Sequence, residues 1–132
     1  MNPIQDRRRS PRLTLEVPVR IVWRDAQGAG HEHNSQTAIV SRHGALIYLA
    51  QPLPLGTELR IINHANNQST TARIVWGGDT LPDGTARAGI EFASPVSYEF
   101  WGMMAVRLWE EQQKVAQHGW LRRLWAWLSG AP

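Results

Sequence analysis

The feature that most constrains the fold is a run of alternating residues near the start of the chain. Apolar side chains recur at every second position and mostly polar ones stand between them, the apolar set being Leu13, Leu15, Val17, Val19, Ile21 and Trp23. A period of two residues is typical of a β-strand with one buried face. We expect a strand over 13–24, with Pro18 at an edge or bulge because proline cannot donate a ladder hydrogen bond.

Further runs with strand character follow, separated by segments rich in Gly, Pro and Asn. They span residues 32–40, 45–50, 57–62, 70–76 and 86–92, and a turn is expected at 25–30. In the last run, alternate residues from Ala86 to Phe92 share the face that we expect to be buried. Six short strands with no helix between them predict an all-β fold, a small six-stranded antiparallel β-barrel over 13–93.

The periodicity changes after the last of these runs. Ser94 is a candidate helix cap and Pro95 a candidate first helical residue. An apolar stripe at helical spacing follows, made of Tyr98, Trp101, Ala105, Leu108 and Trp109. We therefore predict a C-terminal α-helix over 94–118.

The chain contains seven tryptophans, for which we expect two different roles. Trp23, Trp76 and Trp101 are expected to pack in the core between barrel and helix. A Trp/Arg-rich amphipathic tail over 119–132 holds Trp120, Trp125 and Trp127 with Arg122 and Arg123. An exposed aromatic stripe of this kind favours an unknown protein partner or a homodimer, with docking on the same domain or membrane contact as alternatives.

The bulk composition suits one modest domain of 132 residues with 42% hydrophobic content. The absence of cysteine excludes disulfides and thiolate metal sites and makes the cytoplasm the default location. No run approaches the roughly 20 apolar residues of a transmembrane segment, and no apolar run follows the basic start as in a signal peptide.

The net charge of +3 is matched by an arginine-rich leader over 1–12, which we expect to be flexible. Its guanidiniums follow one another as Arg7-Arg8-Arg9-Ser10-Pro11-Arg12. Such a cluster repels itself and is best placed against a polyanionic ligand. The alternative is a solvated basic arm that binds nucleic acid without sequence specificity and with steep salt dependence.

Three segments together resemble the bacterial PilZ domain: the arginine leader entering a strand, Ser41-Arg42-His43-Gly44 between strands, and the closing Ala88-Gly89-Ile90-Glu91-Phe92. The resemblance implies a PilZ-like barrel that binds the second messenger cyclic di-GMP. The first motif of that family, two arginines separated by three residues, falls on Arg8 and Arg12, with Arg9 as a neighbour.

The second motif of the family is an Asp or Asn, one residue, a Ser, two residues and a Gly. Ser41 and Gly44 occupy the last two places, but Ile39 stands where the polar side chain belongs. Isoleucine neither donates nor accepts a hydrogen bond, and a lost polar contact costs on the order of 1 to 3 kcal/mol. We expect weakened binding rather than none.

The resemblance therefore predicts a non-enzymatic receptor for cyclic di-GMP, without a cofactor or a metal. Its ligand-binding residues would be Arg8, Arg9, Arg12, Ser41 and Gly44. Binding would order the leader and so alter a surface offered to a partner. The alternative is a degenerate PilZ-like module that has lost the nucleotide and binds protein.

Two other chemistries are weighed against this interpretation. His31 and His33 would share a face of a strand, as metal ligands do, yet the sequence indicates no third ligand. Ser41 and His43 suggest a nucleophile with a base, but no acid is identified to orient the histidine. For Ser41 and Gly44 alone, a hairpin turn is the simplest interpretation.

Overall fold

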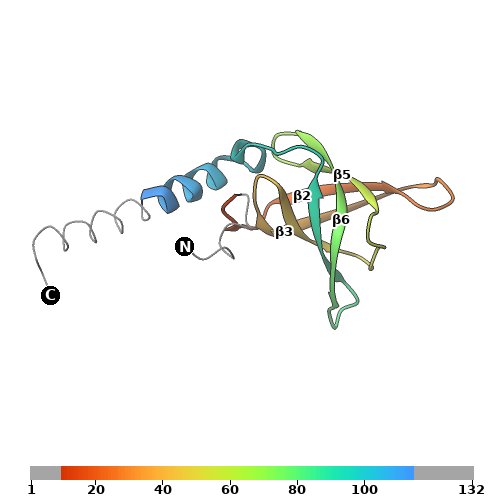
Figure 1. Cartoon of the computed structure of the whole chain (residues 1–132). Coiled ribbons are helices and arrows are strands. Elements are labelled where there is room, and N and C mark those ends of the chain that lie inside the picture. The colour runs from red at the N-terminus through yellow and green to blue at the C-terminus, as the bar shows by residue number, and fades with distance from the viewer. Residues whose placement is uncertain (1–9, 115–132) are drawn as a thin grey trace, which may run out of the picture.

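The computed structural model describes residues 10–114 of the chain (Figure 1). Its strands are β1 (Leu13–Thr14), β2 (Pro18–Arg24), β3 (Gly30–Val40), β4 (Gly44–Leu49), β5 (Glu58–Asn63), β6 (Ser69–Thr80) and β7 (Ala86–Phe92). A short 3-10 helix, η2 (Tyr98–Trp101), and an α-helix over 103–114 follow. Arg8, Arg9, the end of the predicted helix and the predicted tail lie outside the described residues.

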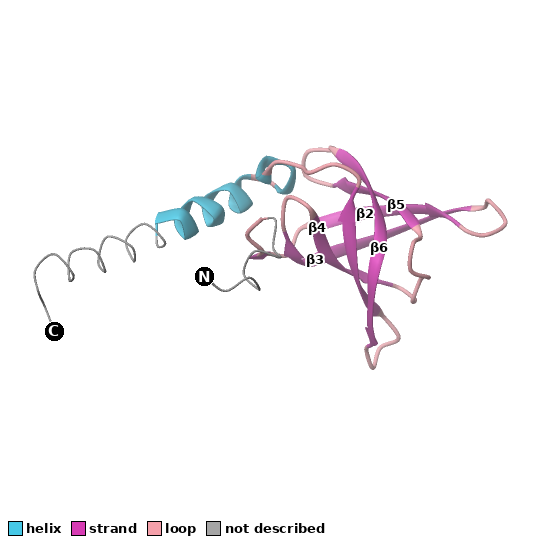
Figure 2. Cartoon of the chain, in the orientation of Figure 1, coloured by secondary structure: helices cyan, strands magenta, loops and turns pink. Residues whose placement is uncertain are grey.

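The strands close into a barrel, as the sequence predicts. The order is β1-β3-β2-β5-β6-β7-β4, every pairing is antiparallel, and an additional pairing of β3 with β4 completes the ring. β1 is the extra strand, pairing with the end of β3 beyond β2. Figure 2 shows the strands curving around a common centre, with the α-helix projecting from one end. The structure is thus a six-stranded barrel with one short added strand and a C-terminal helix.

The first predicted strand is interrupted, and a buried threonine explains the interruption. Thr37 of β3 is fully buried, accepts a 2.9 Å hydrogen bond from Val17 N and donates a 2.7 Å bond to Leu15 O. Its side chain replaces the regular ladder over residues 15–17. Pro18 then begins β2, a position where its missing N–H is tolerated.

The core lies inside the barrel and beneath the residues that follow it. Burial alternates with exposure along β7 as expected, with Ala86, Ala88, Ile90 and Phe92 buried. Phe92 also contacts the aromatic rings of Phe100 and Trp101, at centroid distances of 6.2 and 5.7 Å. The 3-10 helix is therefore packed against the end of the barrel by an aromatic cluster.

Trp76 is not in the core, contrary to the prediction. Trp101 is buried and Trp23 is packed partly against the core, but Trp76 is 50% exposed. The cause is a bulge in β6, where the register with β7 shifts between Ile74 and Trp76. One extra residue, Val75, reverses the alternation, so the indole that would have pointed inward points outward.

The helix begins later than the predicted Ser94 cap. The segment before it is held extended, because Ala93 N donates to Thr71 O at 3.0 Å and Val96 N donates to Arg42 O at 2.8 Å. These backbone groups are engaged with the barrel and do not start a helix. Ser97 precedes η2 instead, and Gly102, with φ 104°, separates η2 from the helix over 103–114.

None of the helices in the described part of the chain has the length and apolar character needed to span a membrane.

Candidate functional site

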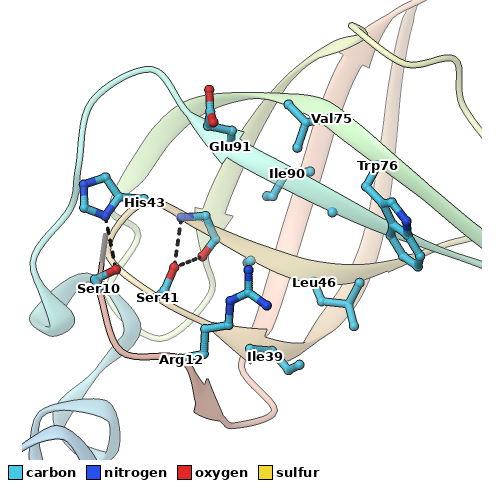
Figure 3. A pocket seen from close by; sticks show the side chains of 13 residues that line it. Ser10, Arg12, Ile39, Ser41, His43, Leu46, Val75, Trp76, Ile90 and Glu91 are labelled. Atoms are coloured by element: carbon cyan, nitrogen blue, oxygen red, sulfur yellow. Dashed lines mark hydrogen bonds between the residues drawn. The ribbon is translucent and has the colours of Figure 1, made fainter. Parts of the chain in front are cut away.

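A cavity of about 620 Å³ opens on the outer face of the barrel. Arg12, Ser41 and Gly44, three of the predicted ligand-binding residues, line it together with Ile39. Figure 3 shows the Arg12 side chain extending between Ser41 and Ile39. The volume lies within the usual range for small-molecule sites, about 300–1,000 Å³. The structure therefore brings the end of the leader and the serine-glycine bend to one site.

The Ser41–Gly44 bend joins β3 to β4. Hydrogen bonds between Ser41 and Gly44 stabilise its conformation. Ser41 N donates to Gly44 O at 2.9 Å, and the Ser41 hydroxyl donates to the same oxygen at 3.1 Å. The hydroxyl also accepts from Gly44 N at 3.2 Å. The hairpin interpretation of this pair is thus confirmed. The hydroxyl oxygen keeps one lone pair that a ligand donor can use.

Gly44 is required by a close approach of two strands. A Cβ atom at this position would stand 2.1 Å from the backbone oxygen of Ile90 in β7. That separation is far below any van der Waals contact, and a backbone oxygen in a sheet cannot move aside. The glycine therefore serves the closure of the barrel at the pocket.

Hydrogen bonds attach the beginning of the described chain to this bend. Ser10 Oγ lies 3.1 Å from His43 Nδ1 and accepts from Arg42 N at 3.3 Å. The Tyr98 hydroxyl donates to Pro11 O at 2.8 Å, and burial raises the pKa of Tyr98, which favours the protonated, donating form. Arg12 is therefore held beside the pocket by contacts on both of its N-terminal neighbours.

The same bend is attached to the segment that leads into the helix. Trp101 Nε1 donates to Ser41 O at 2.8 Å, and Arg42 Nε donates to Val96 O at 3.1 Å. Phe92 N, at the end of β7, donates to His43 O at 2.8 Å. The bend thus connects the leader, the last strand and η2.

One wall of the pocket is an apolar row that crosses the outside of the barrel. In the registers of the sheet, Ile39 pairs with Leu46, Leu46 with Gly89, and Gly89 with Trp76. The Trp76 ring rests on two glycines, since a Cβ on Gly78 would lie 2.6 Å from Cη2 and a Cβ on Gly89 3.2 Å from Trp76 Cβ. These glycines allow the indole to lie flat against the barrel.

The second row beside it is polar. Gly44 pairs with Glu91, and Glu91 with Arg73 of β6. Figure 3 shows Glu91 on the opposite side of the pocket from Arg12, with Trp76 at its far end. The pocket therefore combines a cation, an aromatic surface and a carboxylate.

Sequence reasoning missed Trp76, Glu91 and the contacts of Ser10 and His43. The signal for Trp76 was the Gly77-Gly78 pair that follows it, because glycine inside a strand pattern often marks a bulge. The Ser10–His43 contact joins residues 33 positions apart. It has no local signature.

The histidines and the serine considered for a metal site or a nucleophile have other contacts in the structure. His31 stacks on Trp23 at 5.4 Å, and its Nε2 lies 2.9 Å from Asp25 Oδ2. Within residues 10–114, no group of three or more His, Cys, Asp or Glu side chains is arranged to hold a metal ion. His43 contacts Ser10 through Nδ1. The hydroxyl of Ser41 is engaged within its own turn.

With this geometry in view, comparison with known families identifies the domain. A sequence profile described as the PilZ domain matches residues 6–99, which is more than half of the 132 residues. The chain belongs to the PilZ domain family. The match includes both motifs and the closing strand, so the resemblance inferred from the residues is confirmed. No curated protein sequence matches the chain significantly.

Solved structures agree with a PilZ fold. The Bacillus subtilis inhibitor of motility, MotI/DgrA, is 16% identical, with 81% of this chain and 51% of that chain covered and a TM-score of 0.55. The PilZ domain of YcgR from Escherichia coli, solved with c-di-GMP, is 16% identical, with 86% and 96% covered and a TM-score of 0.51. This PilZ chain thus spans about half the length of the inhibitor of motility. Both likenesses show the shared barrel.

Proposed function

We propose that this PilZ domain is a non-enzymatic receptor that binds cyclic di-GMP in the pocket between the leader and the Ser41–Gly44 bend. The observation that carries the proposal is the meeting of Arg12, Ser41 and an exposed Trp76 in one cavity of about 620 Å³. The YcgR PilZ domain, which was solved with c-di-GMP, supports the choice of ligand.

Arg12 would bind both the phosphodiester charges and the guanine edge of the ligand. A cyclic dinucleotide carries two phosphodiester charges, and each guanine presents the O6 and N7 acceptors that a guanidinium fork meets bidentately. Arg12 is exposed and stands at the pocket, where its side chain has room to reach a ligand. Arg8 and Arg9 would add to this arm from the part of the leader outside the described residues.

Trp76 supplies a surface on which a base can stack. Stacking of a base on an aromatic side chain contributes about 1–3 kcal/mol. Here the indole faces outward, is half exposed and is supported from behind by Gly78 and Gly89. A purine held between this ring and a guanidinium would be gripped on two faces.

The hydrogen bonds of the Ser41–Gly44 bend link the ligand pocket to the surface that a partner would contact. Ser10 and Pro11 are hydrogen-bonded to His43 and Tyr98, and Ser41 is hydrogen-bonded to Trp101. Ligand contacts that draw in the leader would therefore act on the same residues that position η2. The surface altered for a partner would lie at the C-terminal helix over 103–114.

The test is isothermal titration calorimetry with cyclic di-GMP on the full chain. The double variant Arg8→Ala with Arg12→Ala removes the charge-assisted hydrogen bonds of both arginines. It is expected to weaken binding of cyclic di-GMP by at least about 10–100-fold. Arg24→Ala is the matched control, since Arg24 is an exposed arginine that donates to Gly28 O away from the pocket. Equal affinities for the wild type and the double variant would overturn the proposal.

A second candidate, a degenerate module that binds protein, is favoured by one observation. Ile39 lines the pocket and lies in the apolar row with Leu46 and Trp76. Ile39→Asp separates the two functions. A large gain in affinity from an undetectable wild-type level supports the degenerate module, whereas measurable wild-type binding supports the receptor.

A further inference from the structure

The pocket contains a carboxylate that neither family motif includes. Glu91 lines the cavity from β7, between Gly89 and the end of the strand. Its side chain is 38% exposed, and it faces the site from the side opposite Arg12 (Figure 3). In the registers it pairs with Gly44, which places the carboxylate beside the Ser41–Gly44 bend.

A carboxylate has a specific use beside a guanine. The Watson–Crick edge of guanine presents two adjacent donors, N1–H and the 2-amino group, and a carboxylate accepts both through its two oxygens. Such charge-assisted bidentate pairs are stronger than neutral hydrogen bonds. Ile39, two strands away in the same pocket, supplies no acceptor at all.

The present partner of Glu91 holds it only loosely. Arg73 Nη2 lies 3.6 Å from Glu91 Oε1, which is an ion pair longer than a hydrogen bond. Both side chains are substantially exposed, and ion pairs of this kind contribute little. A rotation of the Glu91 side chain would therefore exchange this contact for a guanine edge at small energetic cost.

We infer that Glu91 is a specificity-determining residue of this pocket, accepting the N1–H and 2-amino donors of a guanine and supplying the polar contact that Ile39 does not. This inference rests on the proposed function and deepens it. It assigns the guanine selectivity of the site to β7. Near a doubly anionic ligand, a negative charge that made no such contact would weaken binding, and its removal in Glu91→Ala would then tighten it.

The experiment compares cyclic di-GMP with the inosine analogue of the same cyclic dinucleotide, which lacks the 2-amino group. Calorimetry of the wild type is expected to favour cyclic di-GMP by about 10-fold. In Glu91→Ala the ratio of the two affinities is expected to fall to about 1. Affinity for cyclic di-GMP is expected to fall by more than about 10-fold, because the N1–H contact is lost together with the 2-amino contact. Glu91→Gln, which keeps one acceptor, is expected to lie between them.

Arg73→Ala is the matched control, because it removes the same ion pair and leaves the carboxylate. It is expected to keep the wild-type ratio, and thermal unfolding verifies that all variants fold. A preserved ratio or tighter binding in Glu91→Ala would overturn the inference, as would loss of the ratio in Arg73→Ala. Absence of wild-type binding to cyclic di-GMP would instead overturn the proposed function, and this inference with it.

Discussion

The Ser41–Gly44 bend and the turn after β2 both connect antiparallel strands, but their hydrogen bonds come from different parts of the chain. In the turn, Asp25 Oδ1 accepts from the backbone N–H groups of Gln27 and Ala29, each at 2.9 Å. In the bend, the partners include Ser10, Val96 and Trp101. The turn is a local structure, whereas the bend joins segments that are distant in the sequence.

This difference distinguishes the turn after β2, which only connects two strands, from the bend, which also lines a pocket. The turn after β2 can be described from the residues between Trp23 and His31, which are neighbours in the sequence. The bend acquires its surroundings only when the barrel has closed and η2 has packed against Phe92. Substitutions in the bend should therefore affect the whole domain, while substitutions in the turn should remain local.

The largest expected effect is that of Gly44→Ala. Its Cβ would stand 2.1 Å from the Ile90 backbone oxygen, and overpacking of this kind lowers the free energy of unfolding by about 1–3 kcal/mol or more. Gly30→Ala at the end of the turn is the control, since nothing lies within 4 Å of a Cβ there, and it should change stability by no more than about 0.5 kcal/mol. Urea unfolding measures both, and equal midpoints would contradict the comparison.

Trp101→Phe is expected to have the next largest effect. It removes the 2.8 Å hydrogen bond to Ser41 O from a ring that is only 2% exposed, and a buried acceptor left unpaired costs about 1–3 kcal/mol. Trp23→Phe beside the turn keeps a ring to stack on His31 and should cost less than about 1 kcal/mol. Thermal unfolding of the two variants checks this order, which a greater loss in Trp23→Phe would reverse.

The smallest effect is expected in the turn itself, with Asp25→Asn. The hydrogen bond from His31, followed by that from Ala29, holds the pKa of Asp25 below its usual 3.8. A lowered folded-state pKa stabilises the fold above the unfolded-state pKa, and this contribution disappears as the pH falls through the folded-state pKa. The wild type should therefore be slightly more stable than Asp25→Asn at neutral pH and equally stable once the pH lies below the folded-state pKa of Asp25. A difference in thermal midpoint that persists in acid would exclude this origin.

The parts of the fold that follow local rules were predictable from the sequence. β7 was predicted with its observed bounds because each residue from Ala86 to Phe92 obeys the alternation. The break before Pro18 was not, because it depends on the buried hydroxyl of Thr37 in another strand. A two-residue period cannot report a partner on a different strand.

The residues of the pocket, too, were predictable only where a local sequence motif marks them. The motif identified Arg12, Ser41 and Gly44, and the structure places all three around one pocket. The sequence predicts Trp76 in the core, because the bulge that turns it outward is defined by the register with Gly89 in another strand. The alternation of β7 places Glu91 on the face opposite the buried residues. Its relation to the pocket depends on the pairing with Gly44 in another strand, which the sequence does not show.

The support of Trp76 by Gly78 and Gly89 has a consequence for the evolution of the pocket. A single methyl group added at position 78 would overlap the indole, at 2.6 Å from Cη2, so the ring would have to swing away from the barrel. The mouth of the cavity can therefore be reshaped from behind, by exchanging Gly78, which does not itself line the cavity. Positions 76, 78 and 89 should accordingly change together among descendants of this domain, and diversification of ligand preference need not begin with an arginine.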